Sequence, residues 1–415
     1  MPGIRRRVKT LFQKNRLGRF AFAILQKWRR GHYYRSMYLN VPVDENLILF
    51  ESFLGKSYSC SPKAIYEAMK CNPDFDRYKF VWVFRRSDEM RKIMGDDRTI
   101  VVKYNSRRYY RAFAQAKYWV TNWRLPAAVV KKNNQVCIQT WHGTPLKKIG
   151  MDLEIEGNAT TSQRKGHSLY LNDAKKYDYF VSPSHFCTEV FSSAFGLSRL
   201  GKKNILIETG YPRNDRLVRS SSKDVFEIRK SLGISDNKTV LLYAPTWRDN
   251  QYTAGVGYSF ELDEKINSFL SKLPDDYLVL MRLHYLVANS VTLASYGDKV
   301  IDVSKYGDIN DLYLASDALI TDYSSVFFDY ANLERPILFF MYDLQDYQSN
   351  VRDFYIELDT LPGPIIEDPD ELVASVCDLT EVQRLYRDKY RAFCEKYTYL
   401  DDGNAGLRVA RICFS

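Results

Sequence analysis

The fold is decided by the segment ALITDYSSVFFDYANLERPILFF, which spans residues 318–340. Its two ends, 318–321 and 336–340, are short apolar runs with the length and composition of buried strands. Residues 324–333 between them are predicted to form a helix that begins at a pair of serines. A strand, a helix and a second strand in this order predict two parallel strands joined by a helical crossover.

The same alternation extends through most of the 415 residues. A first set of strands is predicted at 46–51, 79–84, 99–102, 118–121, 136–140 and 179–181, with helices at 61–70, 106–116 and 184–195. The pattern restarts with strands at 205–208, 239–243, 277–282 and 300–302. The sequence therefore predicts two α/β domains with mostly parallel sheets, 39–203 and 204–415, with the helix at 381–397 as a candidate to cross back to the first.

The positive charge is concentrated at the N-terminus. Residues 1–43 contain eleven Lys or Arg and no Asp or Glu, so residues 44–415 carry a net charge of −1 out of the total of +10. A nucleic-acid-binding protein usually carries its basic surface on the folded domain, so no nucleic-acid partner is predicted. The seven Cys include no CxxC pair, which indicates a reducing compartment and no disulfide framework.

Residues 1–38 are predicted to form a basic amphipathic arm, with a possible break at Gly18. Its apolar residues recur at helical spacing, and cations flank them: Leu17, Phe20, Ala21, Ile24, Leu25 and Trp28. Such a helix lies in the headgroup plane of an anionic membrane. The alternatives are a disordered tail and a helix packed on the body. No apolar run is long enough to span a membrane, and no signal peptide is expected.

Ligands of open parallel sheets bind beyond the carboxyl ends of the strands, so the residues there are candidate site residues. Strand 136–140 is followed by Trp141, His142, Gly143, Thr144 and Pro145. Pro145 suits the first turn of a helix, whose free N–H groups would face an anion. An imidazole titrates in the range of a general base, so His142 is a catalytic candidate. The alternative is a histidine that caps its own turn.

Further candidates follow four other strands. They are Arg213 after 205–208, Pro245 and Thr246 after 239–243, Arg282, Leu283 and His284 at the end of 277–282, and Ser324, Ser325 and Asp329 after 318–321. The arginines and His284 suit a phosphate clamp, the serines a phosphate, and Asp329 a ribose. Each has a structural alternative: a turn with an Arg–Asp pair for Arg213, a structural histidine for His284, and plain helix capping for the serines. Together they predict an interdomain cleft for a phosphorylated donor.

With these segments in hand, the chain closely resembles the CDP-glycerol glycerophosphotransferase family of teichoic acid polymerases and primases, with the related ribitol-phosphate transferases and capsule enzymes. The resemblance covers about residues 130–400, with looser agreement from 44. It is carried by TWHGTPLKKIG, YFVSPSHFCTEVFSSAFG, GYPRND, YAPTWRD, RLHY, SKYGDINDLYLASDALITDYSSVFFDYANLERPILFF and RDFYIELDTLPGP. Few other families would share this ordered set.

The resemblance implies a GT-B fold of two Rossmann-like domains and a donor that is CDP-glycerol or CDP-ribitol. It implies catalytic roles for His142 and His284. It places the CDP site mostly on Arg213, Pro245, Thr246, Arg282, Ser324, Ser325 and Asp329. We also assign Trp141, Gly143, Thr144, Pro145 and Leu283 to donor binding. Unlike the large polymerases, the chain has no long N-terminal extension, which leaves priming, polymerisation and single-unit addition open.

The implied reaction is attack of an acceptor hydroxyl on the β-phosphorus of the donor, with release of CMP. The acceptor would be a lipid-linked polymer at the cytoplasmic face of the bacterial cell membrane, where the arm would hold the enzyme peripherally. No metal site and no definite cofactor are predicted, and the need for a divalent ion is left open. The alternatives are a GT-B glycosyltransferase that uses a nucleotide sugar and a basic-armed scaffold without catalytic activity.

Overall fold

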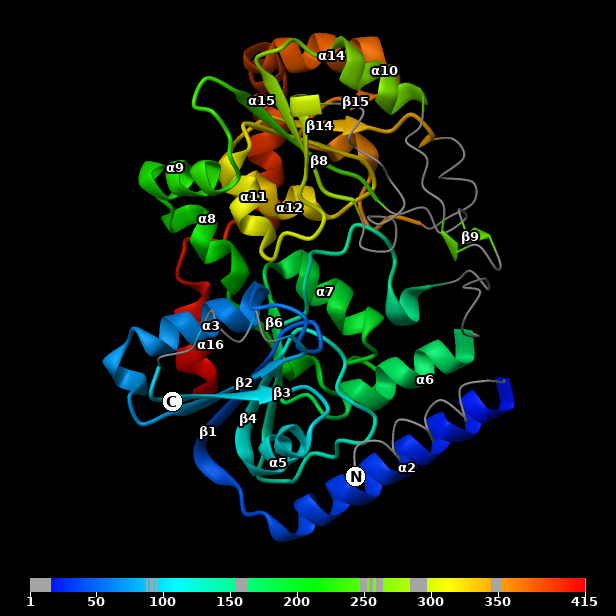
Figure 1. The fold of residues 1–415 in the computed structure, drawn as a ribbon, viewed down its shortest axis with the longest axis vertical. Coiled ribbons are helices and arrows are strands. Elements are labelled where there is room, and N and C mark those ends of the chain that lie inside the picture. Colours follow the sequence, from blue (N-terminus) through cyan, green and yellow to red (C-terminus); the bar gives the residue numbers. More distant parts are fainter. Residues whose placement is uncertain are drawn as a thin grey trace.

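A computed structural model of the chain describes residues 16–86, 89, 93, 96–153, 163–246, 252–253, 257–258, 264–283, 297–344 and 353–414. Two α/β domains face each other, with the N-terminal one below and the C-terminal one above in Figure 1. This confirms the predicted two-domain α/β architecture. His284 lies outside the described residues, as does the arm before Arg16.

The first sheet has seven parallel strands in the order β3-β2-β1-β4-β5-β6-β7. These strands are β1 Asp44–Glu51, β2 Lys79–Phe84, β3 Thr99–Lys103, β4 Ala116–Thr121, β5 Val136–Gln139, β6 Tyr179–Ser182 and β7 Leu206–Glu208. Alternate side chains of each strand enter opposite cores. Leu47 and Leu49 pack toward one face, whereas Ile48 and Phe50 pack toward the other.

Helices cover both faces of this sheet, as buried parallel strands require. In sequence order they are α2 Arg16–Asn40, α3 Cys60–Lys70, α5 Arg107–Gln115, α6 Gln163–Ala174 and α7 His185–Ala194. The chain also contains short 3₁₀ turns at Pro73–Phe75, Gly150–Asp152 and Lys203–Ile205. Aromatic residues of α5 and α7 fill the core on the first face, and α3 covers the second face.

The second sheet has six parallel strands in the order β12-β11-β8-β13-β14-β15. They are β8 Thr239–Ala244, β11 Tyr277–Met281, β12 Val300–Asp302, β13 Ala318–Thr321, β14 Ile337–Phe340 and β15 Ile365–Ile366. A separate antiparallel pair is formed by β9 Tyr252–Thr253 and β10 Gly257–Tyr258. The strands that were predicted from the 318–340 segment are confirmed as adjacent, parallel β13 and β14.

Helices also cover both faces of the second sheet. They are α8 Asp215–Arg219, α9 Ser222–Ser231, α10 Glu264–Lys272, α11 Ile309–Ala315, α12 Val326–Tyr330, α14 Pro369–Cys377 and α15 Leu379–Tyr397. The helix that was predicted at 324–333 is shorter: α12 is followed by a 3₁₀ turn, Ala331–Leu333. Further 3₁₀ turns lie at Pro212–Asn214 and Leu358–Thr360.

Two predictions about the domain boundary need correction. The strand at 205–208, placed at the start of the second domain, is β7, the edge strand of the first sheet, because it pairs with β6. The first domain therefore extends past residue 203. The chain does cross back, but the crossing helix is α16, Ala405–Phe414, rather than the predicted 381–397. Val409 and Phe414 of α16 join the core beneath α3.

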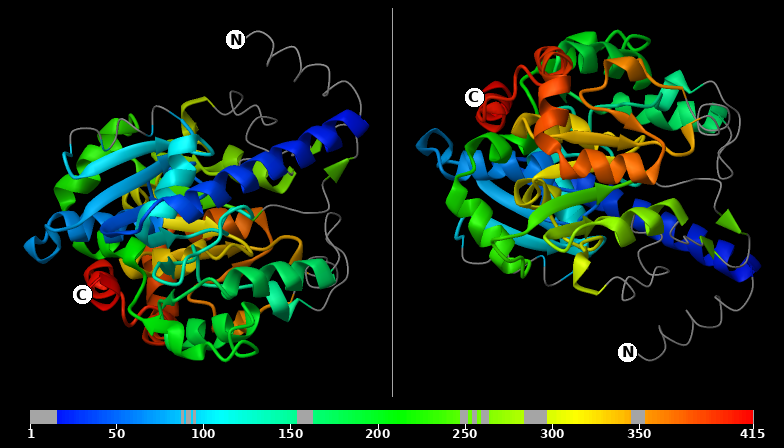
Figure 2. Two further views of the ribbon diagram at one scale, coloured as in Figure 1. Left: turned by 90° about the horizontal axis from the view of Figure 1, so that it is seen from below. Right: turned by 90° about the horizontal axis from the view of Figure 1, so that it is seen from above.

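Helix α2 continues through Gly18 without a break and runs along the outer side of the first domain (Figure 2). Its C-terminal half packs on the body. The Tyr34 ring is buried, its hydroxyl donates to the Val130 carbonyl at 2.6 Å, and it contacts the Tyr110 ring. Leu25, Trp28 and Leu39 are exposed instead. None of the helices in the described ranges is long and apolar enough to cross a membrane.

Candidate active site

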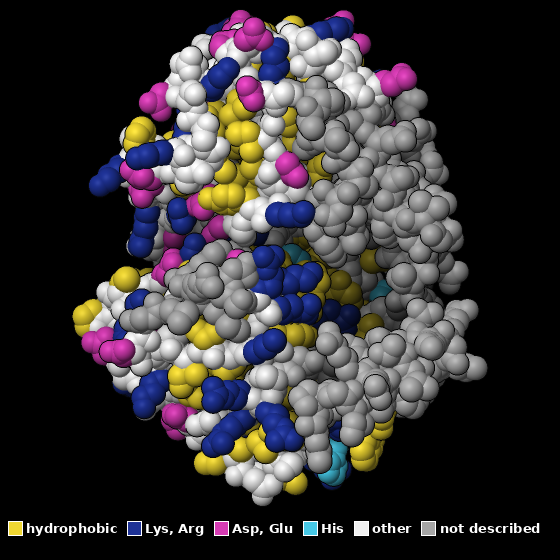
Figure 3. Space-filling view, in the orientation of Figure 1, with side chains coloured by type: hydrophobic (Ala, Val, Ile, Leu, Met, Phe, Trp, Pro, Cys, Tyr) yellow, Lys and Arg dark blue, Asp and Glu magenta, His cyan; other side chains and the backbone are white. Residues whose placement is uncertain are grey.

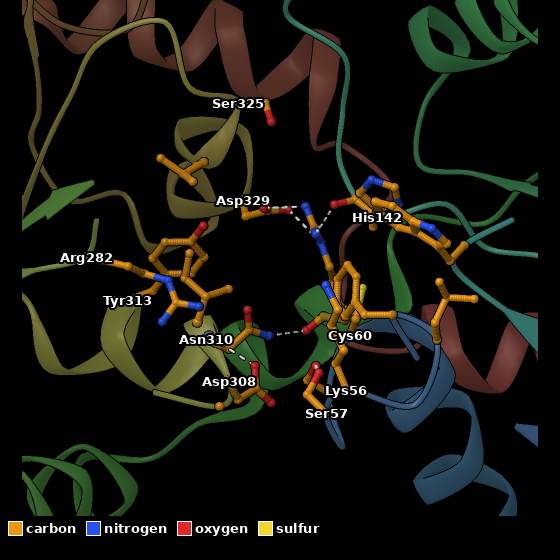
Figure 4. A pocket seen from close by; sticks show the side chains of 18 residues that line it. Lys56, Ser57, Cys60, His142, Arg282, Asp308, Asn310, Tyr313, Ser325 and Asp329 are labelled. Atoms are coloured by element: carbon orange, nitrogen blue, oxygen red, sulfur yellow. Dashed lines mark hydrogen bonds and ion pairs between the residues drawn. The ribbon is translucent and has the colours of Figure 1, made fainter. Parts of the chain in front are cut away.

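Two cavities lie between the domains, and His142 and Ser325 line both of them. The larger has a volume of about 550 Å³ and also contains the predicted residues Arg213, Arg282 and Asp329 (Figure 4). The smaller, about 340 Å³, contains the predicted residues Trp141, Gly143, Thr144, Pro145, Pro245, Thr246 and Ser324. The fold therefore brings together predicted residues that are up to 187 positions apart in the sequence, from His142 to Asp329, as expected for side chains beyond the carboxyl ends of parallel strands.

His142 follows β5 and is held in one orientation. Its Nδ1 lies 2.8 Å from the Asn122 carbonyl oxygen, which can only accept, so Nδ1 carries the proton and Nε2 carries the lone pair. The imidazole stacks on Trp123 at 4.8 Å between ring centroids and packs against the rings of Trp141 and Phe53. This arrangement leaves a neutral, oriented ring nitrogen on the cavity side.

The surroundings of His142 keep it neutral. The pKa of His142 is lowered to about 4, mainly by burial and to a smaller extent by the Arg213 guanidinium, while the hydrogen bond to Asn122 opposes both effects. At neutral pH the side chain is therefore an unprotonated base. A group in this state can accept a proton from a hydroxyl that is brought within hydrogen-bond distance of Nε2.

The backbone around His142 is strained, and the helix that was predicted to begin at Pro145 is absent. Trp141 has a φ of +52°, a conformation that bulky residues rarely adopt and that is often found at functional sites.

Residues 146–149 run alongside the second domain instead of forming a helix. The Tyr355 N–H donates to the Leu146 carbonyl at 2.8 Å, and the Lys148 N–H donates to the Asp353 carbonyl at 2.9 Å. These bonds across the domain junction hold the segment extended.

Arg213 and Asp329 lie at the site but are bonded to each other. The Arg213 Nε donates to Asp329 Oδ1 at 3.1 Å, and Nη2 donates to Oδ2. Its Nη1 donates to the His142 carbonyl at 2.6 Å. The two side chains are only 9% and 4% exposed, so this is a buried bidentate ion pair. All three guanidinium nitrogens are engaged, which fits positioning of the His142 loop against α12 better than direct binding of phosphate and ribose.

The whole segment 210–215 acts as a joint between the domains. The Tyr211 hydroxyl accepts the Gly143 N–H at 2.8 Å. Asp401 accepts from the Tyr211 N–H at 2.6 Å and from the Asn214 amide at 2.7 Å. Gly210 has a φ of +77°, and a Cβ at this position would lie 2.5 Å from the Leu400 carbonyl oxygen. Only glycine fits there without displacing the loop that leads into α16.

Three predicted residues at the end of β11 remain, and each has a different outcome. Arg282 lines the larger cavity, and its Nη1 donates to the Val303 and Tyr306 carbonyls at 3.3 and 3.1 Å. Leu283 lines neither cavity: its side chain lies in the core of the second domain, and its N–H donates to Ser304 Oγ. His284 follows it but lies outside the described residues, so its predicted role is not tested.

Further cavity-lining residues follow β1 and β4, whose carboxyl ends were not considered in the sequence analysis. Phe53 and Leu54 in the loop after β1, and Cys60 at the start of α3, line the larger cavity, as does Trp123 after β4. Phe53, Leu54 and Cys60 have positive φ values of 46°, 58° and 65°, so strained backbone gathers around this cavity. The sequence ESFLGKSYSC directly after a buried strand was the available signal.

Two domains with parallel sheets that enclose an oriented base and cations in the cleft between them define a GT-B-like fold. Comparison with known proteins identifies the family. The family model described as CDP-glycerol:poly(glycerophosphate) glycerophosphotransferase matches residues 33–415. The chain belongs to this family, as its sequence predicted.

Individual relatives agree. A teichoic acid poly(glycerol phosphate) polymerase of Staphylococcus epidermidis is 40% identical over 388 residues, which is 92% of this chain and 53% of that protein. A teichoic acid glycerol-phosphate transferase of Staphylococcus aureus is 38% identical and is covered over 93% of its length, with 89% of this chain. The chain thus spans about half of the first relative and nearly all of the second.

Solved structures show the same fold. The structure of the wall teichoic acid polymerase TagF superimposes with a TM-score of 0.84 at 38% identity, covering 98% of this chain and 96% of that chain. The predicted GT-B arrangement is confirmed, and the alternative of a nucleotide-sugar glycosyltransferase is not favoured.

Proposed function

We propose that this protein transfers glycerol phosphate from CDP-glycerol to a hydroxyl group of a teichoic acid chain and releases CMP. The observation that carries this proposal is His142, a neutral base with a fixed tautomer that lines both cavities of the interdomain cleft. A general base must lie within hydrogen-bond distance of the attacking hydroxyl while that hydroxyl faces the donor, and His142 lines both cavities. The family and its glycerol-phosphate relatives supply the substrate class.

The chemistry follows from that position. The acceptor oxygen attacks the β-phosphorus, and the bond from that phosphorus to the bridging oxygen of the diphosphate breaks. CMP leaves with the electron pair, and the acceptor proton goes to Nε2 of His142. A positioned base of this kind contributes about 10²–10⁴-fold to the rate. The negative charge of a bound diphosphate opposes the effects of burial and of Arg213, so it raises the pKa of His142 as the substrates assemble.

The donor contacts come mainly from the second domain. We assign Arg282, Ser324 and Ser325 to the diphosphate, because they lie beyond the carboxyl ends of β11 and β13 and line the cavities that His142 also lines. The segment 141–145, together with Pro245 and Thr246, forms the wall of the smaller cavity. His284 directly follows Leu283 and is proposed to stabilise the leaving CMP. Arg213 and Asp329 hold the two walls together.

We also propose that the acceptor is lipid-linked and that α2 places the enzyme on the cytoplasmic face of the membrane. Leu25, Trp28 and Leu39 fall on one face of α2 at 3.6 residues per turn, and all three are exposed. Arg29 and Arg35 are exposed on either side of that face. An apolar stripe flanked by cations suits the headgroup region of an anionic bilayer. Substitution of Leu25 and Trp28 by Glu should abolish binding to phosphatidylglycerol vesicles while leaving the buried Tyr34 contacts intact.

The decisive experiment is incubation of the purified protein with CDP-glycerol and a lipid-linked glycerol-phosphate primer. CMP release with a matching increase in primer mass is the expected result, and the size of the increase separates single additions from polymerisation. A parallel reaction with CDP-ribitol tests the second donor. A folded protein that releases no CMP from either donor would overturn the proposal.

A further inference from the structure

We propose that a row of cations along the first domain binds the phosphodiester backbone of the growing chain and guides its end to His142. The row consists of Lys103, Arg85 and Lys56, and the aromatic rings of Phe53 and Trp123 contact the His142 ring at the inner end. This inference rests on the proposed function and adds a recognition site for acceptors that already carry several polyol-phosphate units. The ligand class is a flexible polyanion with one negative charge per repeat.

The order of the strands creates the row. The first five neighbours of the first sheet are β3, β2, β1, β4 and β5. Lys103 is the last residue of β3, Arg85 follows β2, and Lys56 lies in the loop after β1. Trp123 follows β4 and His142 follows β5. Because all these strands are parallel, their carboxyl ends meet at one edge of the sheet, in this sequence from the outside to the base.

Contacts between the strand ends make the row continuous. Arg85 lies over the Tyr104 ring at 4.2 Å, and its Nε donates to the Leu54 carbonyl at 2.7 Å. The Phe53 N–H donates to Asn122 Oδ1 at 2.8 Å, and the carbonyl of the same Asn122 accepts from His142. Each step from β3 to β5 is therefore a direct contact between neighbours.

The row is long enough for several repeats. Neighbouring strands lie about 4.8 Å apart, so four steps from β3 to β5 cover roughly 19 Å. That distance exceeds the length of a single glycerol-phosphate unit. The outermost cation would therefore meet a phosphate that was added in an earlier round, and a short primer would not reach it.

Charge and exposure suit a polyanion. Lys103, Arg85 and Lys56 are all exposed, and Figure 3 shows Lys and Arg side chains gathered along the rim of the first domain that faces the cleft. Glu51, the last residue of β1, is buried, and burial raises its pKa to about 7. Glu89 accepts a hydrogen bond from the Tyr58 N–H, and Asp308 on the opposite wall is paired with Lys63 at 2.9 Å.

The same cations would also attract anionic lipid headgroups, but the position favours the polymer. The row ends at the base and at the cavity wall, where Lys56 lines the larger cavity together with His142 (Figure 4). A lipid contact requires a surface that lies flat on a bilayer, and the exposed apolar face of α2 provides one elsewhere. We therefore assign the row to the acceptor chain.

The test compares acceptors of two lengths. Transfer from CDP-glycerol would be measured for the wild type and for the double variant Arg85→Ala/Lys103→Ala, with lipid-linked acceptors that carry one unit or many units. Each exposed ion pair contributes up to about fivefold, so the KM for the long acceptor should rise about tenfold, while the KM for the one-unit acceptor stays unchanged. The salt dependence of the long-acceptor KM should also weaken. Lys223→Ala/Lys230→Ala on α9, with the same charge change at exposed positions, is the matched control.

The outcomes separate this proposal from the proposed function. If the wild type transfers to neither acceptor, the proposed function fails. If it transfers to both and the double variant affects both equally or neither, the row is not an acceptor site. If the double variant loses binding to phosphatidylglycerol vesicles and keeps its preference for long acceptors, the row is a lipid contact and the proposal is overturned.

Discussion

Two segments of this protein have similar sequence character but opposite uses. TWHGTPLK, residues 140–147, and GYPRND, residues 210–215, each follow a strand of the first sheet and combine glycine, proline and a charged or titratable residue. The first presents His142 to the cavities, with one ring nitrogen anchored and the other available. The second directs its side chains inward, to Asp329, Asp401 and α16. A loop that performs chemistry and a loop that joins domains cannot be distinguished by composition alone.

The difference lies in what surrounds each polar group. Arg213 finds Asp329, whose two oxygens match the guanidinium, and the pair is removed from water. His142 has the Asn122 carbonyl on one side and aromatic rings around it. These contacts fix the orientation of the imidazole but provide no charged partner for it. Changes in GYPRND should therefore mainly affect stability, and a change at His142 should mainly affect turnover.

The sharpest test of this contrast is His142→Ala, which removes the proposed base. We expect turnover to fall about 10²–10⁴-fold, because a positioned base contributes that much. The free energy of unfolding should change less than on loss of one partner of a buried ion pair, because removing the neutral, partly buried ring leaves no buried charge unpaired. Initial rates of CMP release and urea denaturation provide the two measurements. His185→Ala, at an exposed histidine of the same domain, is the control. Near-normal turnover of His142→Ala would end the role assigned to this residue.

Arg213→Ala should mainly lower the stability of the protein, and it should also lower turnover, because it removes the hydrogen bond to the His142 carbonyl. Removing one partner leaves Asp329 buried without its cation, which costs about 3–5 kcal/mol of unfolding free energy. The double variant Arg213→Met/Asp329→Leu should recover most of that stability, because well-packed apolar residues can replace a buried pair. It should not recover turnover, since the bond to the His142 carbonyl is still missing.

The control for the ion pair is Arg216→Ala. Arg216 lies three residues after Arg213 and forms a partly exposed ion pair with Asp311. This substitution should cost at most about 1 kcal/mol. If Arg213→Ala is as stable as Arg216→Ala, the pair does not join the domains. If the double variant regains full turnover, the contact to His142 has no positioning role.

A smaller effect is expected from Asp401→Ala. This carboxylate accepts hydrogen bonds from the Tyr211 N–H and from the Asn214 and Asn332 amides. The variant leaves these donors without an acceptor, which should lower the free energy of unfolding by about 1–3 kcal/mol, as measured by urea denaturation. Glu395→Ala, at an exposed position on α15, should be neutral. Equal stability of the two variants would remove Asp401 from the joint.

The contrast also explains how far sequence reasoning reached. Buried parallel strands are continuous apolar runs, so β1 to β8 and β11 to β14 were found with small errors at their ends. The two-residue β15 carries no such signal, and β7 was assigned to the wrong sheet because only its pairing with β6 decides its membership. The crossing helix α16 was missed because its apolar face depends on α3, which lies far away in the sequence.

The site was predicted in the same uneven way. The expectation that ligands bind beyond the carboxyl ends of the strands correctly located 141–145, 245–246, Arg282 and the two serines. It succeeded because the topology of a parallel sheet alone brings these strand ends together. It could not show that Arg213 pairs with Asp329, since the partners are 116 residues apart. The helix predicted at Pro145 failed for a similar reason: hydrogen bonds to residues 353 and 355 hold that segment extended.

The smallest predicted effect concerns pH and again separates the two loops. The pKa of His142 is about 4 in the folded protein, below the ordinary value of 6.5, so the unfolded chain takes up a proton first as the pH falls. The contribution of the neutral His142 to the free energy of unfolding is therefore fully present above pH 6.5 and is lost as the pH falls from 6.5 to 4. Between pH 7 and 5.5 the wild type should lose roughly 1 kcal/mol of unfolding free energy relative to His142→Phe, which keeps an aromatic ring but cannot titrate. Arg213→Met/Asp329→Leu keeps the burial that is the main cause of the lowered pKa of His142 but lacks the Arg213 charge, so its loss should be somewhat smaller than that of the wild type. Identical pH profiles for the wild type and His142→Phe would mean that the imidazole is not held neutral, and its assignment as the resting base would then fail.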